Sequence, residues 1–440
     1  MNIFSRKINK LEGVCQCPGD KSISQRIVMI GSLMQSDIKV DNFLMGADPI
    51  STLQGMIDIG ASIEVDGNNV LINNKNKNFK DPQSILDLGN SGTGMRLMMG
   101  LISGLNLKAQ LSGDESLSKR PMSRVSDPLS ELGALVSTTN GTAPIDINGN
   151  EGIVDNWTYE MPIASAQVKS ALLLAALTAN KNITIAEGKY TRDHTERMIN
   201  FFGGSVNSIK KEAKNYITLS NKKMDKEHKH YIVAGDFSSS AFIIVAALIS
   251  NQADILIKNV GINETRSGLI NVLKEMNGDI QILNKRNQCN EEVADIRVRS
   301  SKLKGIEVPT WVIPNIIDEI PILSVAASFA DGKTSIKDAK ELRVKESDRL
   351  QATSDGLSKI GVHHKQLEDG IEIYGDSSFF IDKENIIINS YDDHRIAMSF
   401  LVAGMKSYNG IKVKDCENIK TSFPNFIELM NNLGGNLCEI

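Results

Sequence analysis

The sequence predicts an α/β protein built from six copies of one supersecondary unit. Six times, a Gly/Asp/Ser-rich turn opens directly into an apolar run of helix length. These segments begin at Pro18, Leu88, Met161, Ala234, Ile316 and Ser390, which lie 70, 73, 73, 82 and 74 residues apart. A helical stretch that ends at glycine and continues as an alternating strand follows each start after 42 to 45 residues. The fixed period indicates a repeated unit, and the constant offset indicates two helices in each unit.

The helix starts in the first half of the chain read PGDKSISQR from Pro18, LGNSGTGMR from Leu88 and MPIASAQVK from Met161. Those in the second half read AGDFSSS from Ala234, IIDEIP from Ile316 and SYDDHR from Ser390. An aspartate at such a start commonly caps the helix, and this is the role expected for Asp236 and Asp392. The second helix of each unit is expected to end at Gly60, Gly133, Gly203, Gly278, Gly361 and Gly434.

At 440 residues the chain exceeds the usual size of one hydrophobic core, so we expect two domains of three units each, with a hinge near Gly235. The formal net charge is −4 and the acidic and basic residues are interleaved, which argues against nucleic acid and favours small ligands. No apolar run reaches the length of a membrane span, and the first residues, MNIFSRKINK, lack the apolar core of a secretion signal. We therefore expect a cytoplasmic protein with neither a membrane nor a nucleic-acid partner.

The five cysteines form no C-x-x-C pair and do not cluster with the six histidines at zinc spacing. Reduced thiols are expected, with no metal and no cofactor. Cys15 and Cys17 could form a redox pair, but the alternation in VCQCP favours a strand that leads into the first turn.

The first N–H groups of a helix lack intrahelical partners and its dipole is positive there, so a Gly/Ser-rich start lets an anion approach the backbone. Although the net charge is slightly negative, cations gather at these turns: Lys21, Arg26, Arg96, Arg120, Arg192, Lys345, Arg349 and Arg395. This segregation indicates that phosphate or carboxylate groups bind there.

Carboxylates supply the other half of the expected chemistry. Asp318 and Glu346 both lie among cations, which favour the ionised form that a proton acceptor or a stabiliser of positive charge requires. Which of the two donates a proton and which accepts one is open at this point.

Several of these segments, in this order, resemble the 5-enolpyruvylshikimate-3-phosphate (EPSP) synthase family, the 3-phosphoshikimate 1-carboxyvinyltransferases. They are PGDKSISQR, LGNSGTGMR, the Lys-Arg-Pro of GDESLSKRP, SAQVKSALL, RVKESDR and YDDHR. The resemblance extends from Pro18 to Pro424. SAQVK, RDHTE and NETR are similar to the class II branch, in which tolerance of the inhibitor glyphosate is frequent.

The resemblance implies an inside-out α/β barrel fold with two globular domains of three βαβαββ repeats each and the active site in the interdomain cleft. It places residues 1–17 and 236–440 in one domain and residues 18–235 in the other, with hinges near 17–20 and 233–237. The first residues would then pair with the second half of the chain. A monomer is expected.

The implied reaction belongs to the shikimate pathway to chorismate and aromatic amino acids. It transfers the enolpyruvyl group of phosphoenolpyruvate to the 5-hydroxyl of shikimate-3-phosphate and releases phosphate. The residues that match the shikimate-3-phosphate contacts are Lys21, Ser22, Arg26, Ser165, Ala166, Gln167, Arg192, Asp318 and Lys345. Those that match the phosphoenolpyruvate pocket are Lys21, Gly92, Arg120, Gln167, Arg349 and Arg395. The implied catalytic residues are Asp318, as proton acceptor at the hydroxyl, with Glu346 and Lys21.

Two details of this match differ in strength from the rest. Many family members carry a lysine where this chain has Thr421, so a role for the neighbouring Lys420 does not follow from the resemblance. Asn90 and His394 match residues near the phosphoenolpyruvate pocket without a defined role.

Two alternatives remain at this stage. The sister enzyme that transfers enolpyruvate to a UDP-sugar carries a catalytic cysteine on the loop that corresponds to residues 113–120, and this loop contains none here. A non-catalytic sensor of phosphorylated metabolites would need the cations but not Asp318 and Glu346, whose presence favours an enzyme.

Overall fold

The protein is described by a computed structural model that covers residues 1–224, 226 and 228–440. It divides into two compact units. The unit called N-terminal here comprises residues 19–234 and 287–291, and the C-terminal unit comprises residues 1–18, 235–286 and 292–440. Residues 287–291 form the tip of a hairpin. The predicted boundaries place this tip with the C-terminal unit, whereas its contacts group it with the N-terminal unit, where Ile232 N donates to Cys289 Sγ over 3.3 Å.

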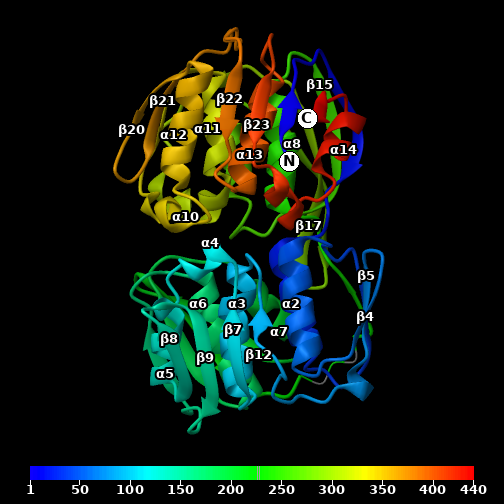
Figure 1. Cartoon of the computed structure of the whole chain (residues 1–440), viewed down its shortest axis with the longest axis vertical. Helices are drawn as coiled ribbons and strands as arrows, with labels where there is room; N and C mark the ends of the chain where they lie inside the picture. Colours follow the sequence, from blue (N-terminus) through cyan, green and yellow to red (C-terminus); the bar gives the residue numbers. More distant parts are fainter. Residues whose placement is uncertain (225, 227) are drawn as a thin grey trace. The chain divides into compact units, whose positions relative to one another are not determined.

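Within the described residues, each unit contains three four-stranded sheets (Figure 1). The sheets of the N-terminal unit are β14 (His230–Ile232), β3 (Ile38–Asp41), β5 (Asn69–Ile72) and β4 (Ile63–Asp66); β6 (Leu86–Asp87), β7 (Lys108–Ser112), β9 (Thr142–Asn150) and β8 (Ala134–Thr139); and β10 (Trp157–Glu160), β11 (Ile183–Glu187), β13 (Lys214–Ser220) and β12 (Ser205–Lys211). In each, the first pair is parallel and the other two pairs are antiparallel.

The C-terminal unit repeats this strand order. Its sheets are β2 (Leu11–Gln16), β15 (Ala253–Gly261), β17 (Glu291–Arg299) and β16 (Asp279–Gln288); β18 (Leu303–Lys304), β19 (Ala330–Ile336), β21 (Ile371–Gly375) and β20 (His363–Gln366); and β22 (Ile386–Asn389), β23 (Ile411–Lys414), β1 (Ile3–Ser5) and β24 (Leu437–Glu439). Strands β1 and β2 come from the start of the chain, so its first residues complete two sheets of the C-terminal unit.

The helices alternate with these strands along the chain. In the N-terminal unit they are α1 (Lys21–Gly31), α2 (Ala47–Asp58), η1 (Asn74–Asn76), α3 (Gly92–Gly104), α4 (Glu115–Ser118), α5 (Ser123–Glu131), α6 (Ala166–Thr178) and α7 (His194–Phe201). In the C-terminal unit they are α8 (Phe237–Ile249), α9 (Gly268–Glu275), η2 (Thr310–Val312), α10 (Ile313–Ile316), η3 (Ile317–Glu319), α11 (Ile320–Ser328), η4 (Lys340–Val344), α12 (Arg349–Ile360), α13 (His394–Gly404), η5 (Glu417–Thr421) and α14 (Phe426–Asn432).

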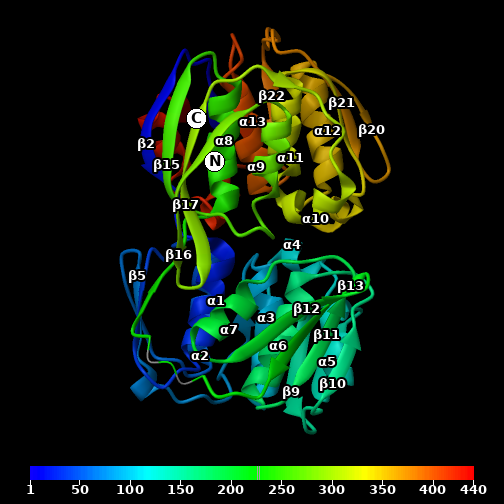
Figure 2. The same cartoon turned by 180° about the vertical axis from the view of Figure 1, so that it is seen from behind.

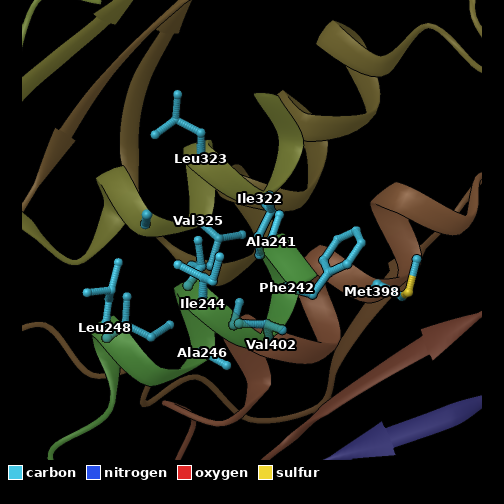
Figure 3. Packing of buried hydrophobic residues seen from close by; sticks show 14 of the residues in the cluster. Ala241, Phe242, Ile244, Ala246, Leu248, Ile322, Leu323, Val325, Met398 and Val402 are labelled. Atoms are coloured by element: carbon cyan, nitrogen blue, oxygen red, sulfur yellow. The ribbon is translucent and has the colours of Figure 1, made fainter. Parts of the chain in front are cut away.

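The helices that begin at the six predicted turns form the interior of the two units. Every residue of α8 is buried, and Figure 3 shows its apolar side chains packed against those of α11 and α13. A helix that is apolar on all sides must lie inside the protein, because no face of it suits water. In the N-terminal unit α3 and α6 approach so closely that a Cβ on Gly100 would lie 2.0 Å from the carbonyl oxygen of Ala171. Glycine is therefore required there.

Local sequence explains where most of these helices begin. The side chains of Asp20, Ser91, Ser165, Asp236 and Asp393 each accept a hydrogen bond from a backbone N–H in the first turn. This confirms the capping role expected for Asp236. The one expected for Asp392 is wrong, because Asp392 has a left-handed backbone (φ 55°) one residue before the cap, and its neighbour Asp393 caps α13.

The predicted helix ends follow a common geometry with one exception. Gly361, for example, ends α12 with φ 88°, a left-handed conformation that glycine adopts without a steric penalty. At the fourth position Asn277 takes the left-handed conformation (φ 72°) instead of the predicted Gly278. Asparagine is the residue that most often replaces glycine in this role.

Cys15 lies in strand β2, so the interpretation of VCQCP as a strand is confirmed. Burial raises the pKa of the Cys15 thiol to about 12 and raises that of Cys17 well above its usual value. Both cysteines are unbonded thiols. Since the thiolate is the reactive form, these shifts disfavour the redox alternative.

Among the residues that the structure describes, one helical stretch, Thr310–Ser328, is long and apolar enough to cross a membrane by length and composition. The expectation that no stretch reaches this length is therefore wrong by that measure. The stretch is 67% buried inside the protein, and a core helix of a globular protein passes the same test, so this is weak evidence for a membrane span.

Candidate active site

The predicted site residues form one group in each unit. The group in the N-terminal unit lies mainly at the starts of α1, α3 and α6, and consists of Lys21, Ser22, Arg26, Gly92, Arg120, Ser165, Ala166, Gln167 and Arg192. The group in the C-terminal unit consists of Asp318, Lys345, Glu346, Arg349 and Arg395.

Lys21 begins α1, where the N-cap Asp20 holds the first turn. Its Nζ atom lies 2.8 Å from Oδ2 of Asp48, a largely buried residue in the first turn of α2. The ion pair holds the ammonium group at the start of the helix. Asp48 was not found from the sequence, because it lies in the second helix of its unit, away from the Gly/Ser-rich turn.

Arg26 lies one turn further along α1 and is almost fully buried. Its Nε donates to Thr195 Oγ1 over 2.8 Å and its Nη2 to Ser170 Oγ over 3.0 Å. Burial lowers the pKa of Arg26 to about 10, and the nearby charge of Arg192 acts in the same direction, whereas Glu196 opposes it. Two guanidinium groups that disfavour each other's charge are well suited to sharing one bound anion.

Gln167 connects α6 to α3. It accepts a hydrogen bond of 2.5 Å from Arg96 Nη1 and donates one of 2.9 Å to Thr93 Oγ1. Arg96 Nη2 also donates to the carbonyl oxygen of Pro121 over 3.0 Å, directly beside Arg120. Arg96, which the sequence offered only as one of several cations, therefore joins the predicted site residue Gln167 to the segment that carries Arg120.

Arg120 is largely buried near the start of α3. Its Nη2 donates to Asn90 Oδ1 over 2.7 Å, and Asn90 Nδ2 donates to Asp114 Oδ2 over 2.7 Å. A Cβ on Gly92 would lie 3.0 Å from Arg120 Nη1, closer than ordinary van der Waals contact. The missing side chain at Gly92 therefore leaves room for the Arg120 guanidinium.

The centre of the C-terminal group is Arg349, whose side chain is 1% exposed at the start of α12. It forms ion pairs with Asp393 (Nε to Oδ2, 2.7 Å), Asp318 (Nη1 to Oδ1, 3.1 Å) and Glu346 (Nη2 to Oε2, 2.6 Å). Burial alone would lower the pKa of Arg349, but the three carboxylates outweigh it and raise the pKa. Arg349 therefore keeps its charge and holds the predicted carboxylates Asp318 and Glu346 on one guanidinium group.

Asp318 lies among cations from several elements. Besides Arg349, its carboxylate has Lys345 Nζ at 4.0 Å, Arg395 Nη2 at 3.9 Å and Arg266 Nη1 at 4.0 Å. Such surroundings favour an ionised carboxylate. Burial lowers the pKa of Lys345, and Asp318 opposes that shift.

Arg395 is held in place by hydrogen bonds to Asp318 and Glu319. Its Nη1 donates to the backbone carbonyl of Asp318 over 3.1 Å and to Oε1 of the buried Glu319 over 3.3 Å. Ser238, in the first turn of α8, also donates to Glu319 and accepts a bond of 2.8 Å from Arg266 Nη2. The sequence placed Glu319 beside Asp318 and Arg266 in the NETR motif, but it contained no signal for their shared contacts.

The remaining predicted positions are less central. His394 is buried at the start of α13. Thr421 is largely buried at the end of η5 and donates to the carbonyl oxygen of Asn418 over 2.7 Å, whereas Lys420 is exposed.

Asp393 offers a test of how the Arg349 cluster is held together. Asp393→Asn keeps a side chain that can cap α13 but removes the buried charge opposite Arg349, so we expect the C-terminal unit to lose about 3 kcal/mol of unfolding free energy. The neighbouring exposed Asp392→Asn is the matched control and should change little. Urea unfolding followed by circular dichroism measures both, and equal stability of the two variants would contradict the role given to the Asp393 charge.

Comparisons with known proteins identify the family. A family model described as EPSP synthase (3-phosphoshikimate 1-carboxyvinyltransferase) matches residues 5–430. The chain belongs to this family. The predicted family and the transferase class of enzyme that acts on small molecules are therefore confirmed.

Similar proteins agree along the whole chain. A relative from Ruthia magnifica subsp. Calyptogena magnifica, named 3-phosphoshikimate 1-carboxyvinyltransferase, is 45% identical over 430 residues, which cover 98% of this chain and 97% of the relative. A relative of the same name from Petrotoga mobilis is 46% identical over 420 residues, which cover 94% of this chain and 95% of the relative. A 2.37 Å structure of EPSP synthase from Acinetobacter baumannii is 40% identical with a TM-score of 0.86 and full coverage of both chains, which confirms the two-domain α/β fold.

A more distant structure has the same fold. The enolpyruvyl transferase NikO from Streptomyces tendae is 14% identical with a TM-score of 0.76 and covers 99% of this chain and 98% of its own. This likeness shows the fold alone.

Proposed function

We propose that the chain transfers the enolpyruvyl group of phosphoenolpyruvate to the 5-hydroxyl of shikimate-3-phosphate, using residues of both groups described above. The observation that supports this most strongly is that Asp318 and Glu346 both form ion pairs with Arg349. Two carboxylates beside several fixed cations can exchange protons with substrates while the cations bind the substrates' anionic groups.

We assign shikimate-3-phosphate to the ligands that the resemblance implies. Its proposed ligands are Lys21, Ser22, Arg26, Ser165, Ala166, Gln167, Arg192, Asp318 and Lys345. Arg26 and Arg192 would bind the phosphate, since each raises the electrostatic cost of the other's charge until an anion is present. Phosphoenolpyruvate is assigned to Lys21, Gly92, Arg120, Gln167, Arg349 and Arg395.

The proposed reaction needs a proton donor, a proton acceptor and stabilisation of the charge that develops. Glu346 protonates the methylene carbon of phosphoenolpyruvate while Asp318 accepts the proton of the attacking 5-hydroxyl. The new bond joins that oxygen to the adjacent carbon. Phosphate then leaves, and the Glu346 carboxylate takes back a proton from the methyl group, which restores the double bond. The nearby carboxylates stabilise positive charge on the carbon, and the cations orient both anionic substrates.

The protein is further proposed to act as a cytoplasmic monomer without a metal or organic cofactor. Its substrates are small and highly anionic, in keeping with the cations of both groups. Size-exclusion chromatography with light scattering measures the oligomeric state.

An initial-rate assay of phosphate release tests the proposed function. We expect release only when both substrates are present, with saturation by each. Tight binding of shikimate-3-phosphate without any release would instead support the metabolite sensor.

Gly92→Ala tests the proposed phosphoenolpyruvate pocket. We expect the native protein to be inhibited by glyphosate competitively with phosphoenolpyruvate, because Gly92 has no side chain to push Arg120 toward a longer bound molecule. The added methyl would lie 3.0 Å from Arg120 Nη1 and displace it slightly, so KM for phosphoenolpyruvate should rise a little. The inhibition constant should rise more, by roughly five- to a hundredfold, because the longer inhibitor needs the same space. Both constants are measured for both proteins, and an equal proportional change would show that Gly92 does not discriminate.

A further inference from the structure

A buried charge cluster in the N-terminal unit lies next to the loop that carries Arg192. Lys169 of α6 is fully buried, and its Nζ lies 2.8 Å from Glu196 Oε1 and 3.3 Å from Glu187 Oε1. The side chains of both glutamates are also buried. Burial alone would lower the pKa of Lys169, but Glu196 and Glu187 outweigh it and raise the pKa, so the ammonium stays charged.

The contacts of this cluster converge on Thr191, the residue before Arg192. Thr191 donates from its backbone N to Glu187 Oε1 over 3.2 Å and from Oγ1 to Glu187 Oε2 over 2.6 Å. Its carbonyl oxygen accepts a bond of 3.4 Å from Lys169 Nζ. The cluster therefore holds both backbone polar groups and the hydroxyl of Thr191.

The other side of the loop is fixed as well. Thr195, in the first turn of α7, accepts a hydrogen bond from Arg26 and donates one of 2.7 Å to Ser170 Oγ. Figure 2 shows α7 beside α1 and α6 in this unit. Arg192 thus lies in a short connection from β11 to α7 whose two ends are held by buried polar contacts.

Arg192 needs such support, because it lies close enough to Arg26 for the two charges to oppose each other. Without a bound anion, a flexible connection would let Arg192 move away from Arg26 into solvent, where its charge is better screened. A buried ion pair adds little to stability compared with apolar residues of the same volume. Apolar residues in place of Lys169 and Glu187 could not hydrogen-bond to Thr191, so they could not orient the loop.

We infer that Lys169, Glu187 and Thr191 act as a positioning set, which orients Arg192 to bind the phosphate group of shikimate-3-phosphate. The inference rests on the proposed function, in which Arg192 is a phosphate ligand. None of the three residues is assigned a contact with the substrate. They act on it through the backbone of Thr191, which fixes the direction in which the next side chain leaves the chain.

The test uses Thr191, because removal of Lys169 would leave two buried carboxylates without their cation. Thr191→Val keeps the shape of the side chain and removes only the hydroxyl that Glu187 binds. We expect the Kd for shikimate-3-phosphate, measured by calorimetry on the whole chain, to rise about tenfold. Thr191→Ser keeps the hydroxyl and should bind like the native protein. The matched control is Thr184→Val on β11, which loses a hydrogen bond of 3.1 Å to Thr218 away from the loop.

Two further measurements separate positioning from a merely structural role. In an Arg192→Ala background, Thr191→Val should have no additional effect on the Kd, because its effect passes through Arg192. Shikimate, which lacks the phosphate, should have the same KM with the native protein and with Thr191→Val. KM for phosphoenolpyruvate should also stay unchanged.

The possible outcomes are distinct. An unchanged Kd for shikimate-3-phosphate in Thr191→Val would overturn the inference. So would an equally large rise of the Kd in the control Thr184→Val, or an equally large effect of Thr191→Val when it is added to Arg192→Ala. If Arg192→Ala itself bound shikimate-3-phosphate normally, both the phosphate role of Arg192 and the inference would be wrong. Since calorimetry measures binding alone, the inference is tested even if the native chain shows no enolpyruvyl transfer, which would contradict only the proposed function.

Discussion

Asp318→Asn should lower kcat by about 10²- to 10⁴-fold, the usual contribution of one acid/base group, while KM for phosphoenolpyruvate changes little. Asparagine keeps the size of the side chain but cannot take a proton from the 5-hydroxyl. Arg349 would still be held by Asp393 and Glu346, and Arg395 by Glu319, so the proposed phosphoenolpyruvate ligands should keep their positions. Steady-state kinetics with both substrates measures the two constants.

The exposed Asp382→Asn in the same unit is the control for this substitution and should behave like the native protein. A native kcat in Asp318→Asn would remove Asp318 from the reaction. A large rise in KM for phosphoenolpyruvate with kcat preserved would instead assign Asp318 to substrate binding.

Glu346→Gln should nearly abolish exchange of solvent hydrogen into the methylene group of phosphoenolpyruvate. Glutamine can still accept a hydrogen bond from Arg349 but cannot donate a proton to carbon. We expect turnover to fall by about 10²- to 10⁴-fold as well. Incubation in deuterated water with both substrates, followed by mass spectrometry of recovered phosphoenolpyruvate, measures the exchange directly.

Glu368→Gln provides the matched control, because the Glu368 side chain is exposed and forms an ion pair of 3.0 Å with Lys340 on the surface. Exchange at the native rate in Glu346→Gln would assign the proton transfer to carbon to another group. Loss of exchange in Asp318→Asn alone would reverse the roles of the two carboxylates.

Much of the fold could be predicted, because each repeat begins and ends its helices with residues that can be recognised from the local sequence. Each interior helix begins at a turn with a capping side chain or a short 3₁₀ segment, and most second helices end at a left-handed glycine. Where two residues could fill one role, the sequence was ambiguous. Asp393 rather than Asp392 caps α13, and Asn277 rather than Gly278 takes the left-handed conformation, because each choice depends on the backbone path one residue away.

The site was harder to predict in full. Cations beside Gly/Ser-rich turns are visible along the chain, so Lys21, Arg349 and Arg395 could be named. Three of the residues that hold them, Asp48, Glu319 and Asp393, could not be assigned this role, because they meet their partners only after the chain has folded. The cluster of Lys169 with Glu187 was missed for the same reason, since an interior lysine in SAQVKSALL has no local feature that names its partner.

The most direct test of the proposed function is to identify the product formed from both substrates. Proton and phosphorus NMR of the reaction mixture should show an enolpyruvyl ether at the 5-position of shikimate-3-phosphate and one phosphate released for each ether formed. Phosphate released without the ether, or formed from phosphoenolpyruvate alone, would contradict the proposal that Asp318 activates the 5-hydroxyl for enolpyruvyl transfer.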